Sequence, residues 1–227
     1  MTHTMTSAPR SANFIRIAIL TTSLLMAAGA TATAESDDPF DKPRTNLGFG
    51  MLVGSASVGY ISGPGVGMHA EIGRQFGKFG VYGEYNLLSV GESSYDVEDP
   101  IRGFMHRVAG NVRYTFAKVG SPRVPVQGAF WLEAGMGRQV VQWHKGGKLT
   151  RNDFGFGFGA QTNFRIGRRS AKPNVIGFHY AFKAFLTPSP DADAMLPATC
   201  AGPCDEPTPP SPHDLGLFFN MGLMWGK

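Results

Sequence analysis

Apolar residues alternate with polar residues or glycine along most of this chain, with a period of two. Segment 152–166 shows the pattern best. Its even positions are mostly apolar: Phe154, Phe156, Phe158, Ala160, Thr162, Phe164 and Ile166. Its odd positions are polar or glycine: Asp153, Gly155, Gly157, Gly159, Gln161, Asn163 and Arg165. Successive side chains of a β-strand point to opposite faces, so this segment is predicted to be a strand with one apolar and one polar face.

The same alternation recurs in seven other segments, least cleanly in the first. The predicted strands cover residues 45–54, 64–76, 79–90, 102–116, 124–143, 152–166, 174–187 and 214–226. Glycines at every second or third position disfavour helices in these segments. Most of the strands exceed the roughly 5–6 residues usual in soluble sheets. They are long enough to cross a bilayer, which takes about 9–11 tilted residues.

The connections between these strands alternate in length. Those after the second, fourth and sixth strands are short or compact: 77–78, 117–123 and 167–173. Those after the first, third, fifth and seventh strands are mostly longer: 55–63, 91–101, 144–151 and 188–213. Such alternation on an even number of strands predicts an all-β fold, an eight-stranded antiparallel up-and-down barrel with one tight end and one loop end.

The polar faces of the predicted strands carry nearly balanced charge. Three acids and four bases lie on them: Glu71, Glu84, Glu133, Arg107, Arg113, Arg165 and Lys183. The interior of an eight-stranded barrel is just wide enough for side chains to fill it. Charges in that space must be paired. We therefore predict a lumen ion-pair network, with glycines making room for long side chains and with the apolar faces toward lipid.

The alternative is a soluble, lipocalin-like barrel whose apolar faces point inward around a ligand. A soluble barrel needs an exterior rich in charged residues. Charged residues make up only 17% of this chain, and the faces that would then be outside are mostly glycine and amides. The composition therefore favours the membrane barrel.

The N-terminus has the pattern of a cleavable export signal. Arg10 and Arg16 precede an uncharged apolar stretch over 17–30, and Ala32-Thr33-Ala34 is a small-residue cleavage site. We predict a signal peptide over 1–34, a short periplasmic leader over 35–44 and the barrel over 45–227. The chain carries 21 Lys and Arg against 17 Asp and Glu, so neither its charge nor its export suggests a nucleic-acid partner.

With its signal peptide, strand count, loop alternation and final strand 215–225, the chain resembles the small outer-membrane β-barrel proteins of Gram-negative bacteria, the OmpA and OmpX type. The resemblance implies a location in the bacterial outer membrane, in contact with membrane lipid and lipopolysaccharide. Members usually end on an aromatic residue that the barrel-insertion machinery reads. Here the aromatic, Trp225, stands two residues before the end. Residues 35–44 are too few for the peptidoglycan-binding domain of some relatives.

The chain has two cysteines, Cys200 and Cys204, in the long Pro-rich loop 188–213. An even number of cysteines in an oxidising compartment favours a disulfide. A metal site with His213 or Asp205 is the alternative, although two thiolates at this spacing are not a zinc pattern.

Some eight-stranded outer-membrane barrels are lipid A-modifying enzymes that use His with Ser and an acid. The deacylase type has a serine two residues after the histidine, and Ala181 stands there after His179. His179 is therefore expected to be a lumen histidine with its hydrogen bonds satisfied. We assign no catalytic residue, cofactor or metal ligand.

The function predicted is that of a structural or surface outer-membrane barrel with a filled lumen and external loops that can bind a partner. The identity of that partner does not follow from the sequence. A narrow diffusion channel is the first alternative, because lumen glycines could leave the interior under-packed. A lipid A-modifying enzyme is the second.

Overall fold

The computed structural model describes residues 43–58, 61–91, 102–120, 125–144, 147–166, 174–188 and 213–227. Within this part of the chain lie eight strands: β1 Arg44–Val58, β2 Ile61–Phe76, β3 Phe79–Gly91, β4 Arg102–Val119, β5 Val126–Trp143, β6 Lys148–Ile166, β7 Asn174–Pro188 and β8 His213–Gly226. The predicted signal peptide, most of the leader and both cysteines lie outside the described residues.

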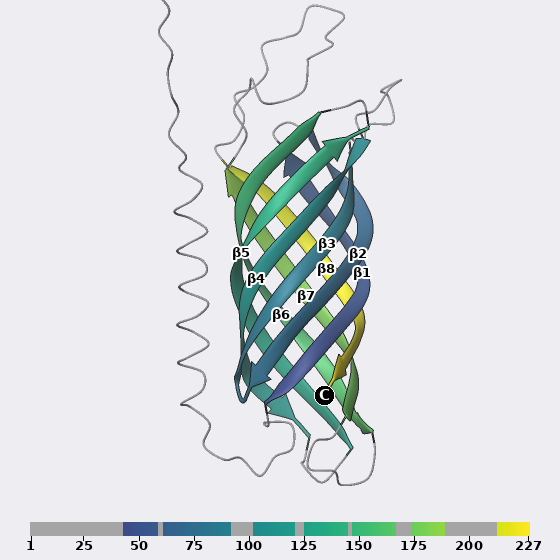
Figure 1. Cartoon of the computed structure of the whole chain (residues 1–227), viewed down its shortest axis with the longest axis vertical. Coiled ribbons are helices and arrows are strands. Elements are labelled where there is room, and N and C mark those ends of the chain that lie inside the picture. The colour runs from purple at the N-terminus through teal and green to yellow at the C-terminus, as the bar shows by residue number, and fades with distance from the viewer. Residues whose placement is uncertain are drawn as a thin grey trace, which may run out of the picture. The chain divides into compact units, whose positions relative to one another are not determined.

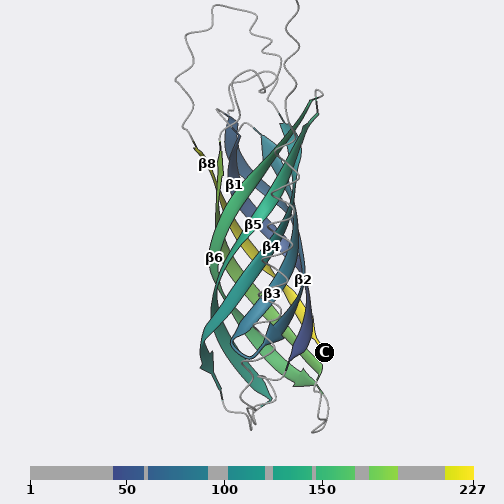
Figure 2. The same ribbon diagram turned by 60° about the vertical axis from the view of Figure 1, so that its left-hand side comes forward.

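The strands form one closed antiparallel barrel. Each strand pairs with its sequence neighbours, and β8 pairs with β1, for example through Leu52↔Asn220 (Figure 1). Figure 2 shows the strands crossing one another at a tilt on the near and far walls. The predicted eight-stranded up-and-down barrel is thereby confirmed. Among the described residues, no helix is long and apolar enough to cross a membrane.

The tight end of the barrel contains a two-residue hairpin. Gly77 and Lys78 alone join β2 to β3, and Gly77 has a φ of 58°. A positive φ is costly for any residue with a Cβ, which explains the glycine at this turn. On the next hairpin, the register of β4 against β5 shifts between Thr115 and Ala117, so β4 contains a bulge there.

The predicted alternation of connection lengths is wrong at two places. β1 continues to Val58 and β2 begins at Ile61, so the predicted loop 55–63 is mostly paired strand. β6 begins at Lys148, which leaves only 144–147 after β5. The Gly- and Ser-rich composition suggested a loop, but ladder pairs such as Ser55↔Pro64 extend these strands. Two long connections remain at the loop end, 92–101 and 189–212.

The polarity of the barrel is the reverse of that of a soluble protein. Large apolar side chains from all eight strands face outward, among them Phe49, Leu132, Phe158 and Leu223, each more than half exposed. The buried side chains include arginines, a lysine, glutamates and amides. The lipocalin-like alternative, with apolar faces inward, is therefore wrong.

Candidate functional site in the barrel lumen

The middle of the lumen holds a chain of seven alternating charges. Ion pairs join Asp153, Arg107, Glu84, Lys183, Glu133, Arg113 and Glu71 in that order. These residues come from the six strands β2 to β7, because each strand presents every second residue to the lumen. Their side chains are at most 3% exposed.

The distances between the paired charges are short along the whole row. Arg107 Nη2 lies 2.8 Å from Asp153 Oδ1, and Arg107 Nη1 lies 3.3 Å from Glu84 Oε1. Lys183 Nζ bridges Glu84 and Glu133, 2.6 Å from Glu133 Oε1. The guanidinium of Arg113 bridges the last two acids. Its Nη2 lies 3.0 Å from Glu133 Oε2 and 2.8 Å from Glu71 Oε2. The bonds within the chain are charge-assisted, the strong class of hydrogen bond.

Six of the seven charged residues singled out in the sequence lie in this chain. The seventh, Arg165, is half-buried near the end of β6, and no ion pair joins it to the chain in the described part of the molecule. Asp153 takes part although the sequence analysis left it out of the network. It lies on the same face of β6 as Gly155 and Gln161, so the period of two alone could have found it.

Aromatic rings support the two arginines. The Arg113 guanidinium lies between the rings of Tyr82 and Trp131, 4.0 and 3.9 Å from their centroids. Arg107 lies 3.8 Å from the ring centroid of Phe185. Such contacts stabilise a buried cation that has lost its water.

Glycines leave the space that the charges fill. A Cβ at Gly137 would lie 2.8 Å from Asp153 Oδ1 and 2.9 Å from Arg107 Nη2. A Cβ at Gly155 would lie 2.7 Å from a ring carbon of Phe185, on which Arg107 packs. Both glycines are therefore packing positions of the lumen.

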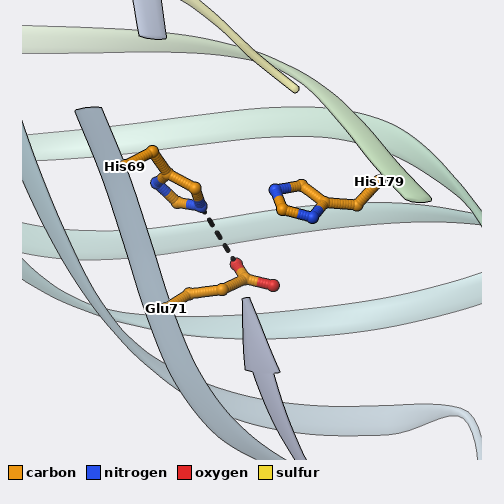
Figure 3. A group of neighbouring side chains, drawn as sticks. All are labelled: His69, Glu71 and His179. Carbon is orange, nitrogen blue, oxygen red and sulfur yellow. Dashed lines mark ion pairs between the residues drawn. The ribbon is translucent and has the colours of Figure 1, made fainter. Parts of the chain in front are cut away.

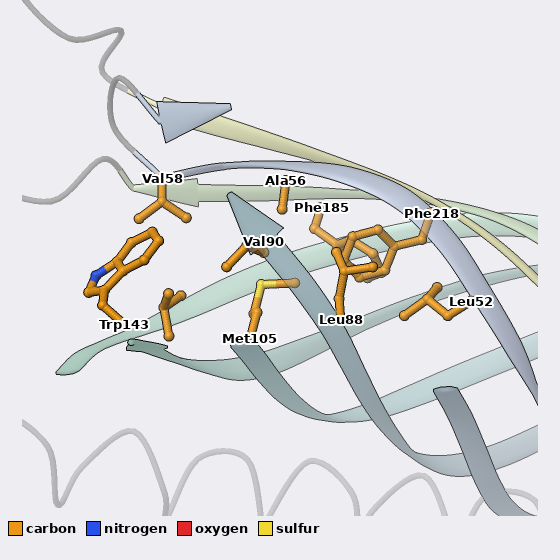
Figure 4. Packing of buried hydrophobic residues seen from close by; sticks show 10 residues of the cluster. Leu52, Ala56, Val58, Leu88, Val90, Met105, Trp143, Phe185 and Phe218 are labelled. Carbon is orange, nitrogen blue, oxygen red and sulfur yellow. The ribbon is translucent and has the colours of Figure 1, made fainter. Parts of the chain in front are cut away.

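The loop end of the lumen holds polar and apolar side chains. Arg151 pairs there with Asp214, and Gln139 Nε2 donates to Thr187 Oγ1 at 3.2 Å. Beside them lies an apolar cluster, which we call the loop-end cluster: Leu52, Ala56, Val58, Leu88, Val90, Met105, Val141, Trp143, Phe185 and Phe218. Figure 4 shows them packed inside the ribbon toward the end where the loops begin. The sequence analysis missed this cluster, although its members stand at inward positions of their strands.

Two histidines and a glutamate meet beside the Glu71 end of the charged chain. His69 and Glu71 come from β2 and His179 comes from β7 (Figure 3). His69 Nε2 lies 3.7 Å from Glu71 Oε2, and the two imidazole rings meet edge to face with centroids 5.4 Å apart. His69 Nδ1 lies 2.9 Å from Asn86 Oδ1.

The lumen position expected of His179 is confirmed, but the hydrogen bonds expected of it are not found among the described residues. The residue is buried, yet neither of its ring nitrogens has a hydrogen-bond partner among the described residues, and His69 Nε2 has none either. The sequence shows both histidines at inward positions, but not that β2 and β7 bring them together across the lumen.

No family model and no curated protein sequence matches the chain. Among solved structures it is similar to Ail, the attachment invasion locus protein of Yersinia pestis, at 14% identity and a TM-score of 0.39, over 82% of this chain and 99% of that one. It is also similar to Neisserial surface protein A, at 10% identity and a TM-score of 0.43, over 79% of this chain and 95% of that one. At these identities the similarity concerns the fold alone.

Proposed function

We propose that this protein is a structural or surface barrel of the bacterial outer membrane, with its loop end outside and its tight end toward the periplasm. The reversed polarity carries the proposal. In water, an apolar belt drawn from all eight strands would be a large exposed patch of the kind that monomeric soluble proteins rarely show. In lipid it is the expected surface, because a closed barrel satisfies its backbone groups internally.

The lumen supports a structural role over a channel. The seven-charge chain occupies the middle of the barrel, and the loop-end cluster lies between it and the loops, beside the Arg151–Asp214 ion pair. An ion crossing this lumen would have to displace paired charges and pass the apolar side chains of the loop-end cluster. We therefore place the activity of the protein in its outer surface and its connections. The connections 92–101 and 189–212 are the segments offered to an external partner, whose identity is open.

A first experiment tests the membrane barrel. The full chain, exported in a Gram-negative host, is expected in the outer-membrane fraction, migrating at one position in SDS gels when unboiled and at another when boiled. Recovery as a soluble periplasmic protein without a heat shift would contradict the proposal.

A second experiment separates the structural role from the channel. The purified barrel in planar bilayers is expected to show no discrete conductance steps. Reproducible conductance steps from protein that is folded, as shown by its heat shift in SDS gels, would reinstate the narrow channel.

A third experiment tests the orientation. A short epitope placed within 92–101 is expected to bind antibody on intact cells, whereas an epitope placed within 167–173 is expected to bind only after the outer membrane is broken. The opposite pattern would reverse the barrel in the membrane.

A further inference from the structure

The pair of lumen histidines has the donor set of a metal site. One ligand atom from each of His69, Glu71 and His179 lies within 4.8 Å of the other two, and all three residues are buried. His69 and Glu71 stand two positions apart on β2, so both point inward, and His179 faces them from β7 (Figure 3). Ligand bonds to zinc are about 2.0–2.2 Å long, so small side-chain rotations would bring all three donors onto one ion.

The unpartnered nitrogens are a second, independent observation. His179 and His69 are each 1% exposed, and His69 Nε2 and both nitrogens of His179 have no hydrogen-bond partner in the described part of the chain. Buried polar atoms without partners are rare, and each one calls for an explanation. A bound cation would take up the lone pairs of one nitrogen from each ring.

The surroundings of His69 favour a ligand role for its Nε2 atom. Asn86 Oδ1 lies 2.9 Å from Nδ1 and can only accept, so this contact is a hydrogen bond in the tautomer that carries its proton on Nδ1. In that tautomer the Asn220 amide nitrogen, 3.3 Å from Nδ1, does not donate to it. With the proton on Nδ1, the lone pair is on Nε2, the atom nearer Glu71. Asn86 also donates to Glu84, which holds the amide in the required orientation. Metal-binding histidines ordinarily donate their second nitrogen to such an acceptor.

Charge favours a cation at the same place. In the described residues, the ion-paired chain contains four carboxylates and three cations, so it is left with one negative charge when both histidines are neutral. The row of ion pairs ends at Glu71, beside the histidines. Arg113 donates one hydrogen bond to each oxygen of Glu71, but a carboxylate offers about four lone-pair sites, so about two remain and a metal ion needs one.

We propose that His69, Glu71 and His179 bind one divalent transition-metal ion inside the barrel. Two imidazoles and one carboxylate are ligands for zinc and its neighbours, whereas calcium and magnesium prefer oxygen ligands alone. The ion links β2 to β7, which are not hydrogen-bonded to each other, and so cross-braces the barrel at mid-height.

The test measures bound zinc on the full mature chain, made without a histidine tag. The protein is folded into detergent micelles with zinc chloride, passed through a desalting column and analysed for zinc by mass spectrometry. We expect about one zinc per barrel, in line with a three-ligand site. We also expect a higher thermal unfolding temperature than in protein folded with EDTA. Cobalt in place of zinc is expected to give visible d–d absorption bands.

Variants locate the ion. His179→Gln is expected to lose the zinc. Loss of an outer-shell partner alone lowers metal affinity about 10- to 100-fold, and loss of a ligand is expected to lower it at least as much. His144→Gln is the matched control. His144 is exposed at the loop end, 5.4 Å from Phe104 between ring centroids, and its replacement is expected to leave binding unchanged.

Every outcome bears on the proposal. Wild-type protein that is folded, as shown by its heat shift, but holds no zinc would overturn it. Zinc retained in folded His179→Gln would also overturn it, because the ion would then lie elsewhere, for instance at the cysteines. If His179→Gln does not fold, His69→Gln is measured instead and judged by the same criterion.

Discussion

Replacing Arg113 with methionine tests the physical account of the lumen most directly. The change removes the cation that joins Glu71 to Glu133 and lies between the rings of Tyr82 and Trp131. Glu133 keeps Lys183 at 2.6 Å, whereas among the described residues Glu71 keeps one ion-pair partner, His69 at 3.7 Å. The row of ion pairs is then left with four carboxylates against two cations.

The expected loss is large because the remaining charges stay buried. Breaking a buried pair by removing one partner costs about 3–5 kcal/mol. Desolvated contacts of a cation with aromatic rings contribute about 2 kcal/mol each, part of which the methionine side chain recovers. We therefore expect the free energy of unfolding to fall by about 5 kcal/mol.

A comparison with Glu133→Gln makes the prediction sharper. This variant also breaks buried pairs, but it leaves three carboxylates against three cations. We expect a smaller loss, about 2–3 kcal/mol, near the value of hydrogen bonds to a charged group. Arg165→Met, at a half-buried arginine outside the chain, is the control and is expected to cost less than about 1 kcal/mol.

The assay is urea unfolding of the full chain in detergent, followed by circular dichroism with EDTA present so that bound metal does not contribute. An Arg113→Met barrel within 1 kcal/mol of the wild type would refute the buried network. A Glu133→Gln variant less stable than Arg113→Met would refute the charge counting, although not the inward placement of these residues.

Three further predictions concern packing, the lipid face and the long loop. Gly137→Ala is expected to destabilise the barrel by about 1–3 kcal/mol through overpacking. Gly110→Ala, where a Cβ meets nothing within 4 Å, is the control and is expected to be nearly neutral. Equal urea midpoints for the two variants would contradict the packing role of Gly137. Leu132→Arg, on the outer face of β5, should cost about 2–4 kcal/mol in lipid vesicles, and no loss would mean that this face meets water. Cys200 and Cys204 are expected to resist alkylation until reduced, as peptide mass mapping would show, and ready alkylation would rule out the disulfide.

The strands were predictable because the period of two is a local property. Each strand is half lumen and half outer surface, so alternation identified both the strand and the inward face of Glu71, Glu84 and Lys183. The ends were less predictable. The small residues at 54–57 suggested a loop, but the strand continues to Val58 because these positions pair with β2 across a two-residue connection.

Contacts across the lumen were not predictable from the same signal. Alternation places His69 and His179 inside, but their meeting depends on the tilt and stagger of the whole barrel, which the pattern along one strand does not contain. Arg165 shows the converse. It stands at an inward position of β6, but only one residue before the strand ends, where it is no longer fully buried.

Side chains close both ends of the lumen, and this closure bears on how a metal ion reaches His69. At the loop end the interior closes with apolar side chains such as Leu88 and Phe218 and with the ion pair of Arg151 and Asp214. At the tight end, polar side chains form a hydrogen-bonded line in which Asn46 donates to the Tyr82 hydroxyl, Tyr82 donates to Gln75, and Gln75 donates to the Gly77 carbonyl oxygen. A cation entering from either end therefore meets a fixed positive charge, Arg151 at the loop end and the Arg113 guanidinium on the Tyr82 ring at the tight end. It would also lose its hydration among the apolar side chains of the loop-end cluster. An ion that binds at His69 is therefore expected to enter during folding, before these side chains close the lumen.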